Sequence, residues 1–183
     1  MGGQLVQAED ELAAINMTIG AAFGGVPAFT ATSGPGFSLM QEAIGYAQKV
    51  GVPSVFVDVQ RVGPATGMPT MPGQGDILQV RYGSSGDYTP IAFYPNSVPE
   101  AFNLAVSAFN AAEESRSPVV LLSDTFVAHL NEVVDLDELE AEVRAVPREM
   151  APLAGVVAEP RFFAGVLMYE HGPNAGEPAT ADA

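Results

Sequence analysis

The chain has 183 residues, 48% of them hydrophobic, which suits one globular domain with a core and excludes a disordered tail. Seven Lys and Arg against 22 Asp and Glu give a formal charge of −15, which disfavours binding to nucleic acid or to an anionic membrane. The chain has no cysteine to form a disulfide or ligate an iron–sulfur cluster, and no apolar run reaches the roughly 20 residues of a membrane span, so we expect a cytoplasmic protein.

Short apolar runs alternate with longer segments of helical period, which is typical of a parallel sheet covered on both faces. After a short first strand at 4–7, we predict strands at 27–32, 53–59, 90–95 and 117–124. The helices between them are expected at 10–23, 37–50, 74–83 and 97–115. The predicted fold class is therefore α/β, with an open, mostly parallel sheet and helices on both faces.

The composition changes after about Leu130. Residues 1–130 are predicted to form the α/β domain, and 131–183 an acidic helical segment followed by a linker-like tail. Within the domain, the connection from Gln60 to Gly75 is long and rich in Gly and Pro, and long ordered loops usually carry function.

Three segments follow predicted strands and should meet at one rim of the sheet, where open α/β sheets bind ligands. They are "QAE", "TATSGPG" and "DVQRVGPATGMPT", at 7–9, 30–36 and 58–70. Three acids also stand in a row before the first helix. Asp10 and Glu11 can interact with the helix N-terminus, whereas Glu9 directly follows the first predicted strand and is expected to face the cleft.

Each candidate residue has a structural alternative. "TSGPG" either allows close approach of the main chain to a flat ligand or is a simple turn before a helix. Arg61 either grips a carboxylate or forms a structural ion pair. His129 and His171 are interpreted as structural or solvated, and no metal site is expected on this chain. Neither a dinucleotide-binding motif nor a P-loop is present.

Taken together, the motifs "VQAEDELAAIN", "FTATSGPGFSLMQEAIGYA", "VDVQRVGPATGMPTMPGQGDILQVRYGSSGDY" and "PVVLLSD" resemble one family. It is the alpha subunit of 2-oxoacid:ferredoxin oxidoreductases, and the match is to its pyrimidine-binding domain, which belongs to the thiamin diphosphate enzyme superfamily. The resemblance runs from about Gln4 to His129 in consistent order.

The resemblance implies roles for five residues. Glu9 matches the glutamate that lies beside the aminopyrimidine of thiamin diphosphate, where an apolar pocket would raise the pKa of its carboxyl so that it shares a proton with the ring. Arg61 matches an arginine that grips the substrate carboxylate. Thr32, Ser33 and Gly34 would line the cofactor pocket.

The implied activity is oxidative decarboxylation of a 2-oxoacid to acyl-CoA, with transfer of electrons to ferredoxin. Thiamin diphosphate would be shared with a beta subunit that carries the magnesium ion and a [4Fe-4S] cluster. We expect 2-oxoglutarate as the substrate, with pyruvate or a branched-chain 2-oxoacid as alternatives.

Two departures leave other readings open. Val62 and Ala65 stand where many members of the family have Gly and Ser, and an upstream motif with a substrate-contacting threonine has no counterpart, so the chain resembles a fragment or a minimal subunit. The main alternative is a non-catalytic, truncated assembly module. Another thiamin-dependent decarboxylase or transketolase half is opposed by the loop "QRVGPATGMPTMPGQGD".

Overall fold

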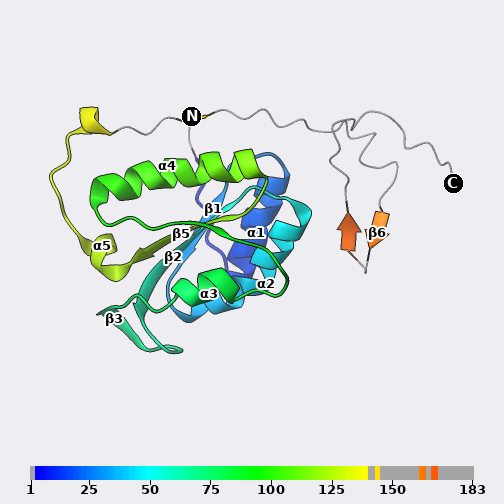
Figure 1. Cartoon of the computed structure of the whole chain (residues 1–183), viewed down its shortest axis with the longest axis horizontal. Helices are drawn as coiled ribbons and strands as arrows, with labels where there is room; N and C mark the ends of the chain where they lie inside the picture. Colours follow the sequence, from blue (N-terminus) through cyan, green and yellow to red (C-terminus); the bar gives the residue numbers. More distant parts are fainter. Residues whose placement is uncertain (1–2, 140–142, 145–160, 164–165, 169–183) are drawn as a thin grey trace. The chain divides into compact units, whose positions relative to one another are not determined.

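The computed structural model describes residues 3–139, 143–144, 161–163 and 166–168, and its contacts divide the chain into two units, 1–146 and 147–183 (Figure 1). The first unit contains the five-stranded sheet and the helices that flank it.

A five-stranded sheet organises the first unit. Its parallel strands lie in the order β1 (Phe29–Thr32), β2 (Val55–Val62), β5 (Val119–Asp124) and β4 (Ile91–Phe93), and β3 (Met68–Pro72) pairs antiparallel with β2. No described strand pairs with the outer edge of β1. The register between β1 and β2 runs from Phe29 opposite Val55 to Thr32 opposite Asp58. The open, mostly parallel sheet predicted from the sequence is confirmed.

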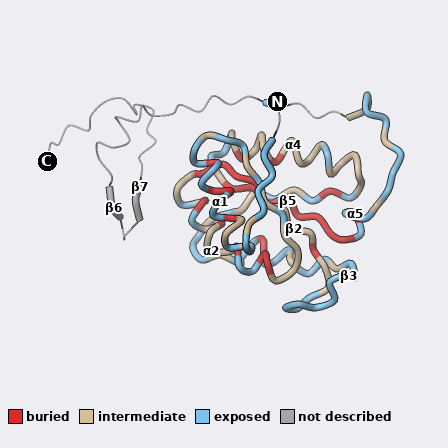
Figure 2. The backbone as a smooth tube through the Cα atoms, turned by 180° about the vertical axis from the view of Figure 1, so that it is seen from behind, coloured by how far each residue is buried: buried red, intermediate tan, exposed pale blue. Residues whose placement is uncertain are grey.

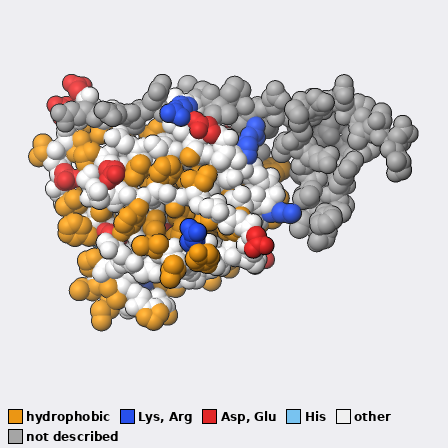
Figure 3. Space-filling view, viewed as in Figure 1, with side chains coloured by type: hydrophobic (Ala, Val, Ile, Leu, Met, Phe, Trp, Pro, Cys, Tyr) orange, Lys and Arg blue, Asp and Glu red, His pale blue; other side chains and the backbone are white. Residues whose placement is uncertain are grey.

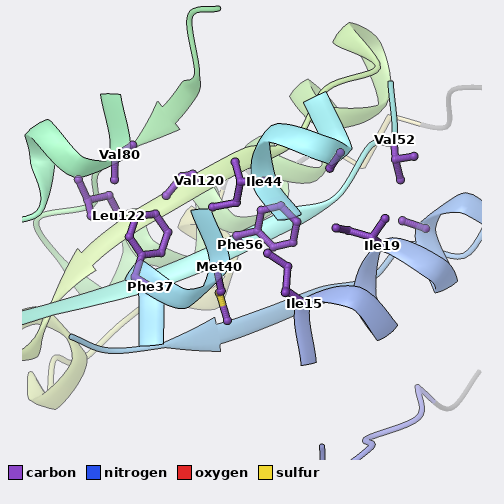
Figure 4. Close-up of a cluster of buried hydrophobic side chains, with 12 residues drawn as sticks. Ile15, Ile19, Phe37, Met40, Ile44, Val52, Phe56, Val80, Val120 and Leu122 are labelled. Atoms are coloured by element: carbon purple, nitrogen blue, oxygen red, sulfur yellow. The ribbon is translucent and has the colours of Figure 1, made fainter. Parts of the chain in front are cut away.

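Helices cover both faces of this sheet, as predicted. α1 (Glu11–Phe23), α2 (Pro35–Val50) and α3 (Ile77–Tyr82) pack on one face, and α4 (Val98–Ser115) packs on the other. The larger buried cluster lies between the sheet and the first three helices (Figure 4). All six residues of β5 are buried, as are most residues of the first half of β2 (Figure 2).

Side-chain N-caps fix the residues at which α1 and α4 begin. Asp10 is the N-cap of α1, and its Oδ1 accepts a hydrogen bond of 2.8 Å from the Ala13 N–H. Ser97 caps α4 in the same way, with a 3.3 Å bond from the Glu100 N–H, and Glu100 stands three residues after Ser97, as in a capping box.

The strand predicted at 4–7 is wrong. Gln4–Gln7 has no strand conformation, and the Leu5 side chain is fully exposed. A strand requires a neighbour that pairs with its N–H and C=O groups, and these four residues make no such ladder within the described chain.

Four elements of the described chain were not predicted. The long loop after β2 contains β3, and α5 (Thr125–His129) follows β5 directly. The second unit contains an antiparallel pair, β6 (Arg161–Phe163) and β7 (Val166–Met168). In the predicted acidic helical segment, the structure shows a 3-10 helix at Leu136–Glu138. No helix among the described residues is long and apolar enough to cross a bilayer.

Candidate functional site

The carboxyl ends of β1 and β2 bring two of the predicted segments together. Gly34 follows β1, has a φ of +67°, and lies against the side chain of Arg61 from the end of β2. A Cβ atom built on Gly34 would be 2.5 Å from Arg61 Nε and 2.8 Å from Cζ. Only glycine tolerates both this backbone conformation and this close approach. Ser33 fixes the same turn, because its hydroxyl donates a 2.6 Å hydrogen bond to the carbonyl of Val59.

Arg61 is half-buried and only partly satisfied. Its Nη2 donates a 3.3 Å hydrogen bond to the Thr66 carbonyl in the loop after β2. Its Nε is buried and has no hydrogen-bond partner, and Arg61 forms no ion pair with any described residue. The structural ion pair considered as an alternative for Arg61 is therefore not seen in the described part of the chain. A guanidinium with an unused buried donor can bind a carboxylate.

Glu11 reaches the same sheet edge from the first turn of α1. A Cβ on Gly36 would be 2.5 Å from Glu11 Oε1 and would overlap the hydroxyl of Thr32, so both side chains converge on this glycine. Glu11 is half-buried, whereas Glu9 is exposed and makes no hydrogen bond with a described residue. The structure thus places Glu11 beside Thr32 and does not place Glu9 there.

A second polar group lies at the carboxyl ends of β5 and β4. Asp124 Oδ2 accepts hydrogen bonds of 2.8 Å from Gln74 Nε2 and 2.9 Å from the Tyr94 hydroxyl, and its Oδ1 accepts one of 2.9 Å from the Val127 N–H. Burial alone would raise the pKa of Asp124, but these hydrogen bonds lower it below its usual range. Burial, followed by the bond to Asp124, raises the pKa of Tyr94.

Asp58 lies in β2 among apolar side chains. It is 0% exposed, and neither of its carboxyl oxygens has a hydrogen-bond partner. Burial, and then the negative charge of nearby Asp76, raise the pKa of Asp58 to about 7. Burial also raises the pKa of Asp76, whose backbone N–H donates a 2.9 Å hydrogen bond to Gln60 Oε1.

Sequence reasoning gave no site role to Glu11, Asp58 or Asp124. A sequence signal was available for each. Asp58 and Asp124 interrupt or end otherwise apolar strands, and a charged residue buried in a strand requires a reason. Glu11 stands one residue after an N-cap, so its side chain starts on the helix rather than in the preceding segment.

The described residues fit one half of a thiamin diphosphate site. The Glu11 carboxylate, the Thr32 hydroxyl and glycine backbone lie together at the sheet edge, and these groups suit the polar edge of an aminopyrimidine. No cluster of three or more His, Cys, Asp or Glu within the described part of the chain could hold a metal ion.

Comparisons with known proteins agree with the resemblance predicted from the sequence. Residues 2–179 match the family model described as "Pyruvate flavodoxin/ferredoxin oxidoreductase, thiamine diP-bdg". The chain is 54% identical over 147 residues to the 2-oxoglutarate synthase subunit KorA of Methanothermobacter marburgensis, covering 80% of this chain and 39% of that one. It is 42% identical to the alpha subunit of 2-oxoacid:ferredoxin oxidoreductase 1 of Sulfurisphaera tokodaii, covering 86% and 25%.

A solved structure is also similar. It is 2-oxoglutarate:ferredoxin oxidoreductase from Magnetococcus marinus with 2-oxoglutarate, coenzyme A and succinyl-CoA bound. The TM-score is 0.68 at 43% identity, and the match covers 69% of this chain and 22% of that one. The chain thus spans less than half the length of each of these three relatives.

Proposed function

The chain belongs to the pyruvate flavodoxin/ferredoxin oxidoreductase family of thiamin diphosphate-binding domains, and we propose that it contributes the pyrimidine-binding half of the active site of a 2-oxoacid:ferredoxin oxidoreductase. The preferred substrate is 2-oxoglutarate, because 2-oxoglutarate synthase subunits are among the most similar relatives. The observation that carries this proposal is the convergence of Glu11 and Thr32 on Gly36 at the edge of the sheet.

When bound, thiamin diphosphate supplies the electron sink that allows the bond between the oxo carbon and the carboxylate of a 2-oxoacid to break. We assign to Glu11 the role that the sequence analysis gave to Glu9. Its carboxyl would hold a proton against the ring nitrogen of the aminopyrimidine, while Thr32 and the Gly34 backbone position the ring.

Arg61 would bind the substrate carboxylate. Its planar fork of donors matches a carboxylate, its Nε is buried and unused, and Gly34 allows the side chain to lie flat against the β1–α2 turn. Holding the carboxylate orients the oxo carbon for reaction.

The diphosphate, the magnesium ion and a [4Fe-4S] cluster would reside on a beta subunit, with ferredoxin as electron acceptor and coenzyme A as acyl acceptor. A partner surface is supported by exposed apolar side chains near the candidate site. Met68, Met71, Ile77 and Leu78 are each at least half exposed, on β3 and the start of α3 (Figure 3). The cytoplasmic location remains a prediction.

The first test is viologen-dye reduction by this chain reconstituted with its cognate beta subunit, thiamin diphosphate, magnesium and coenzyme A, across a panel of 2-oxoacids. We expect reduction only when both chains are present. An assembled, cofactor-loaded complex that reduces no dye with any 2-oxoacid would favour the non-catalytic assembly module instead.

The same assay separates the two glutamates. Glu11→Gln removes the shared proton and should lower kcat by about 100-fold or more, whereas Glu9→Gln should stay within about three-fold of the wild-type chain. The reverse outcome would return the role to Glu9, and activity in both variants would remove the carboxyl from the mechanism.

Arg61→Lys replaces a bidentate fork with a point charge and should raise KM for the 2-oxoacid by about ten-fold or more, with a smaller effect on cofactor binding. Titration of thiamin diphosphate into the assembled variant measures the second quantity. An unchanged KM with weakened cofactor binding would move Arg61 from the substrate to the cofactor.

A further inference from the structure

Two residues paired across β2 and β5 bind the end of the loop that follows β2. Gln60 and Asp124 are paired across β2 and β5. Asp124 Oδ2 accepts the 2.8 Å hydrogen bond from Gln74, and Gln60 Oε1 accepts the 2.9 Å bond from the Asp76 N–H. The two paired residues therefore fix the chain at two points, just before α3.

Asp124 itself is held rigidly. It is 3% exposed, and the Val127 N–H and the Tyr94 hydroxyl also donate hydrogen bonds to it. The lowered pKa keeps it ionised at neutral pH, so it can only accept hydrogen bonds. Tyr94, just after β4, and Val127 in α5 fix its orientation, and Gln74 is the donor to Asp124 that comes from the loop.

The loop that Gln74 closes passes around Arg61. β3 pairs back along β2, with Arg61 opposite Pro72 and Val62 opposite Met68. The Thr66 carbonyl accepts the hydrogen bond from Arg61 Nη2. A Cβ on Gly73 would lie only 2.7 Å from the Val62 backbone nitrogen, so the returning chain packs directly on the end of β2.

We propose that Asp124 is a positioning residue, which holds Gln74, closes the loop from 63 to 76, and so fixes the Arg61 guanidinium for the carboxylate of the substrate. The inference rests on the proposed function for its substrate, but its effect on Arg61 is measurable in the chain alone.

The first measurement follows Arg61 without any enzymatic assay. Phenylglyoxal modifies arginine side chains, and mass spectrometry of the full chain gives the rate at each site. Gln74→Leu removes the hydrogen bond to Asp124 without changing charge, and should speed modification of Arg61 by about three-fold or more while exposed Arg81 keeps its rate.

Gln48→Leu is the matched control. Gln48 also donates a side-chain hydrogen bond between elements, to the Ser117 hydroxyl at 3.3 Å, but it lies on α2 away from the loop. The control should leave the Arg61 rate unchanged. An Arg61 rate that is the same in Gln74→Leu and the wild-type chain overturns the proposal, as does an equal increase in both variants.

The second measurement uses the assembled enzyme. Gln74→Leu should raise KM for 2-oxoglutarate by about three- to ten-fold, change kcat by less than about two-fold, and leave thiamin diphosphate affinity unchanged. A general structural defect would lower kcat and cofactor affinity together, and that result overturns the positioning role.

A donor–acceptor exchange tests the specific bond. Gln74→Glu places two acceptors face to face and should raise KM at least as much as Gln74→Leu. Adding Asp124→Asn restores a donor and an acceptor, keeps an N-cap for α5, and should bring KM back to within about three-fold of wild type. No rescue overturns the proposal. If the wild-type complex turns over no 2-oxoacid, the proposed function fails, while the Arg61 labelling rates still decide whether Gln74 and Asp124 position that side chain.

Discussion

The buried carboxyl of Asp58 makes the free energy of unfolding depend on pH. Its pKa of about 7 in the folded chain lies above the ordinary value of 3.8, so the folded state binds the proton more tightly than the unfolded state. Stability from this group is therefore fully present below about pH 4 and is lost as the pH rises towards 7.

Asp58→Asn should remove this loss, because an amide of the same shape never ionises. We expect the variant and the wild-type chain to differ least near pH 4, where the Asp58 carboxyl is protonated in the folded state and most of this stability is still present, and the variant to be more stable by roughly 1–3 kcal/mol at pH 8. Urea denaturation at both pH values measures the difference.

Asp76→Asn should reduce the slope of the free energy of unfolding against pH without abolishing it, since burial is the larger cause of the raised Asp58 pKa and the Asp76 charge the smaller. A stability difference that is independent of pH would contradict the raised pKa.

At the residue scale, the sequence predicted the end of the sheet at which the candidate site lies, whereas the role of Glu11 in place of Glu9 is a proposal from the structure. Arg61 and Thr32 lie at the carboxyl ends of two parallel strands, and their meeting could be predicted because parallel strands end on the same side. The choice between Glu9 and Glu11 depends on where α1 begins. Three adjacent acids precede the apolar part of the helix, and the sequence does not show which residue is the first of the helix. In the structure Asp10 is the cap, which puts Glu11 in the first turn of α1.

At the scale of the elements, the backbone conformation at the start of α2 determines how much space the Arg61 side chain has. Gly34 precedes the helix with a left-handed φ, and its missing side chain makes room for Arg61. Gly34→Ala should lower the free energy of unfolding by about 1–3 kcal/mol and raise KM by displacing the guanidinium.

Gly20→Ala is the control for that substitution. Gly20 lies inside α1, and a Cβ there would meet no atom within 4 Å. Alanine should therefore stabilise the helix by about 0.5–1 kcal/mol. Urea denaturation of both variants provides the comparison, and a Gly34→Ala chain as stable as Gly20→Ala would rule out the close contact with Arg61.

Elements with their own hydrophobic pattern were predictable, and the others were not. The four parallel strands are short apolar runs, and the four longer helices have a clear period. β3 is exposed at every position and contains two prolines, so no strand pattern marks it. α5 is five residues long and is set by the Asp124 cap rather than by amphipathicity.

At the scale of the whole molecule, the two faces of the five-stranded sheet carry buried clusters of different size. α1, α2 and α3 cover one face with the larger buried cluster, and α4 covers the other with a smaller one. The candidate site lies at the carboxyl end of this layered core, where β1 and β2 end. The core thus supports Gly34 and Arg61 from below. In our proposal, the loop from 63 to 76, held by Asp124 through Gln74, fixes the Arg61 side chain from the other side.

The outer edge of β1, with which no strand in the described part of the chain pairs, has a consequence for handling the protein. Exposed N–H and C=O groups, beside a Phe29 side chain that is 60% exposed, offer a template on which a strand from another copy can add and begin aggregation. A formal charge of −15 opposes such encounters through repulsion between copies, and dissolved salt screens that repulsion. The isolated chain should accordingly remain dispersed best in dilute buffer, and added salt should promote its precipitation.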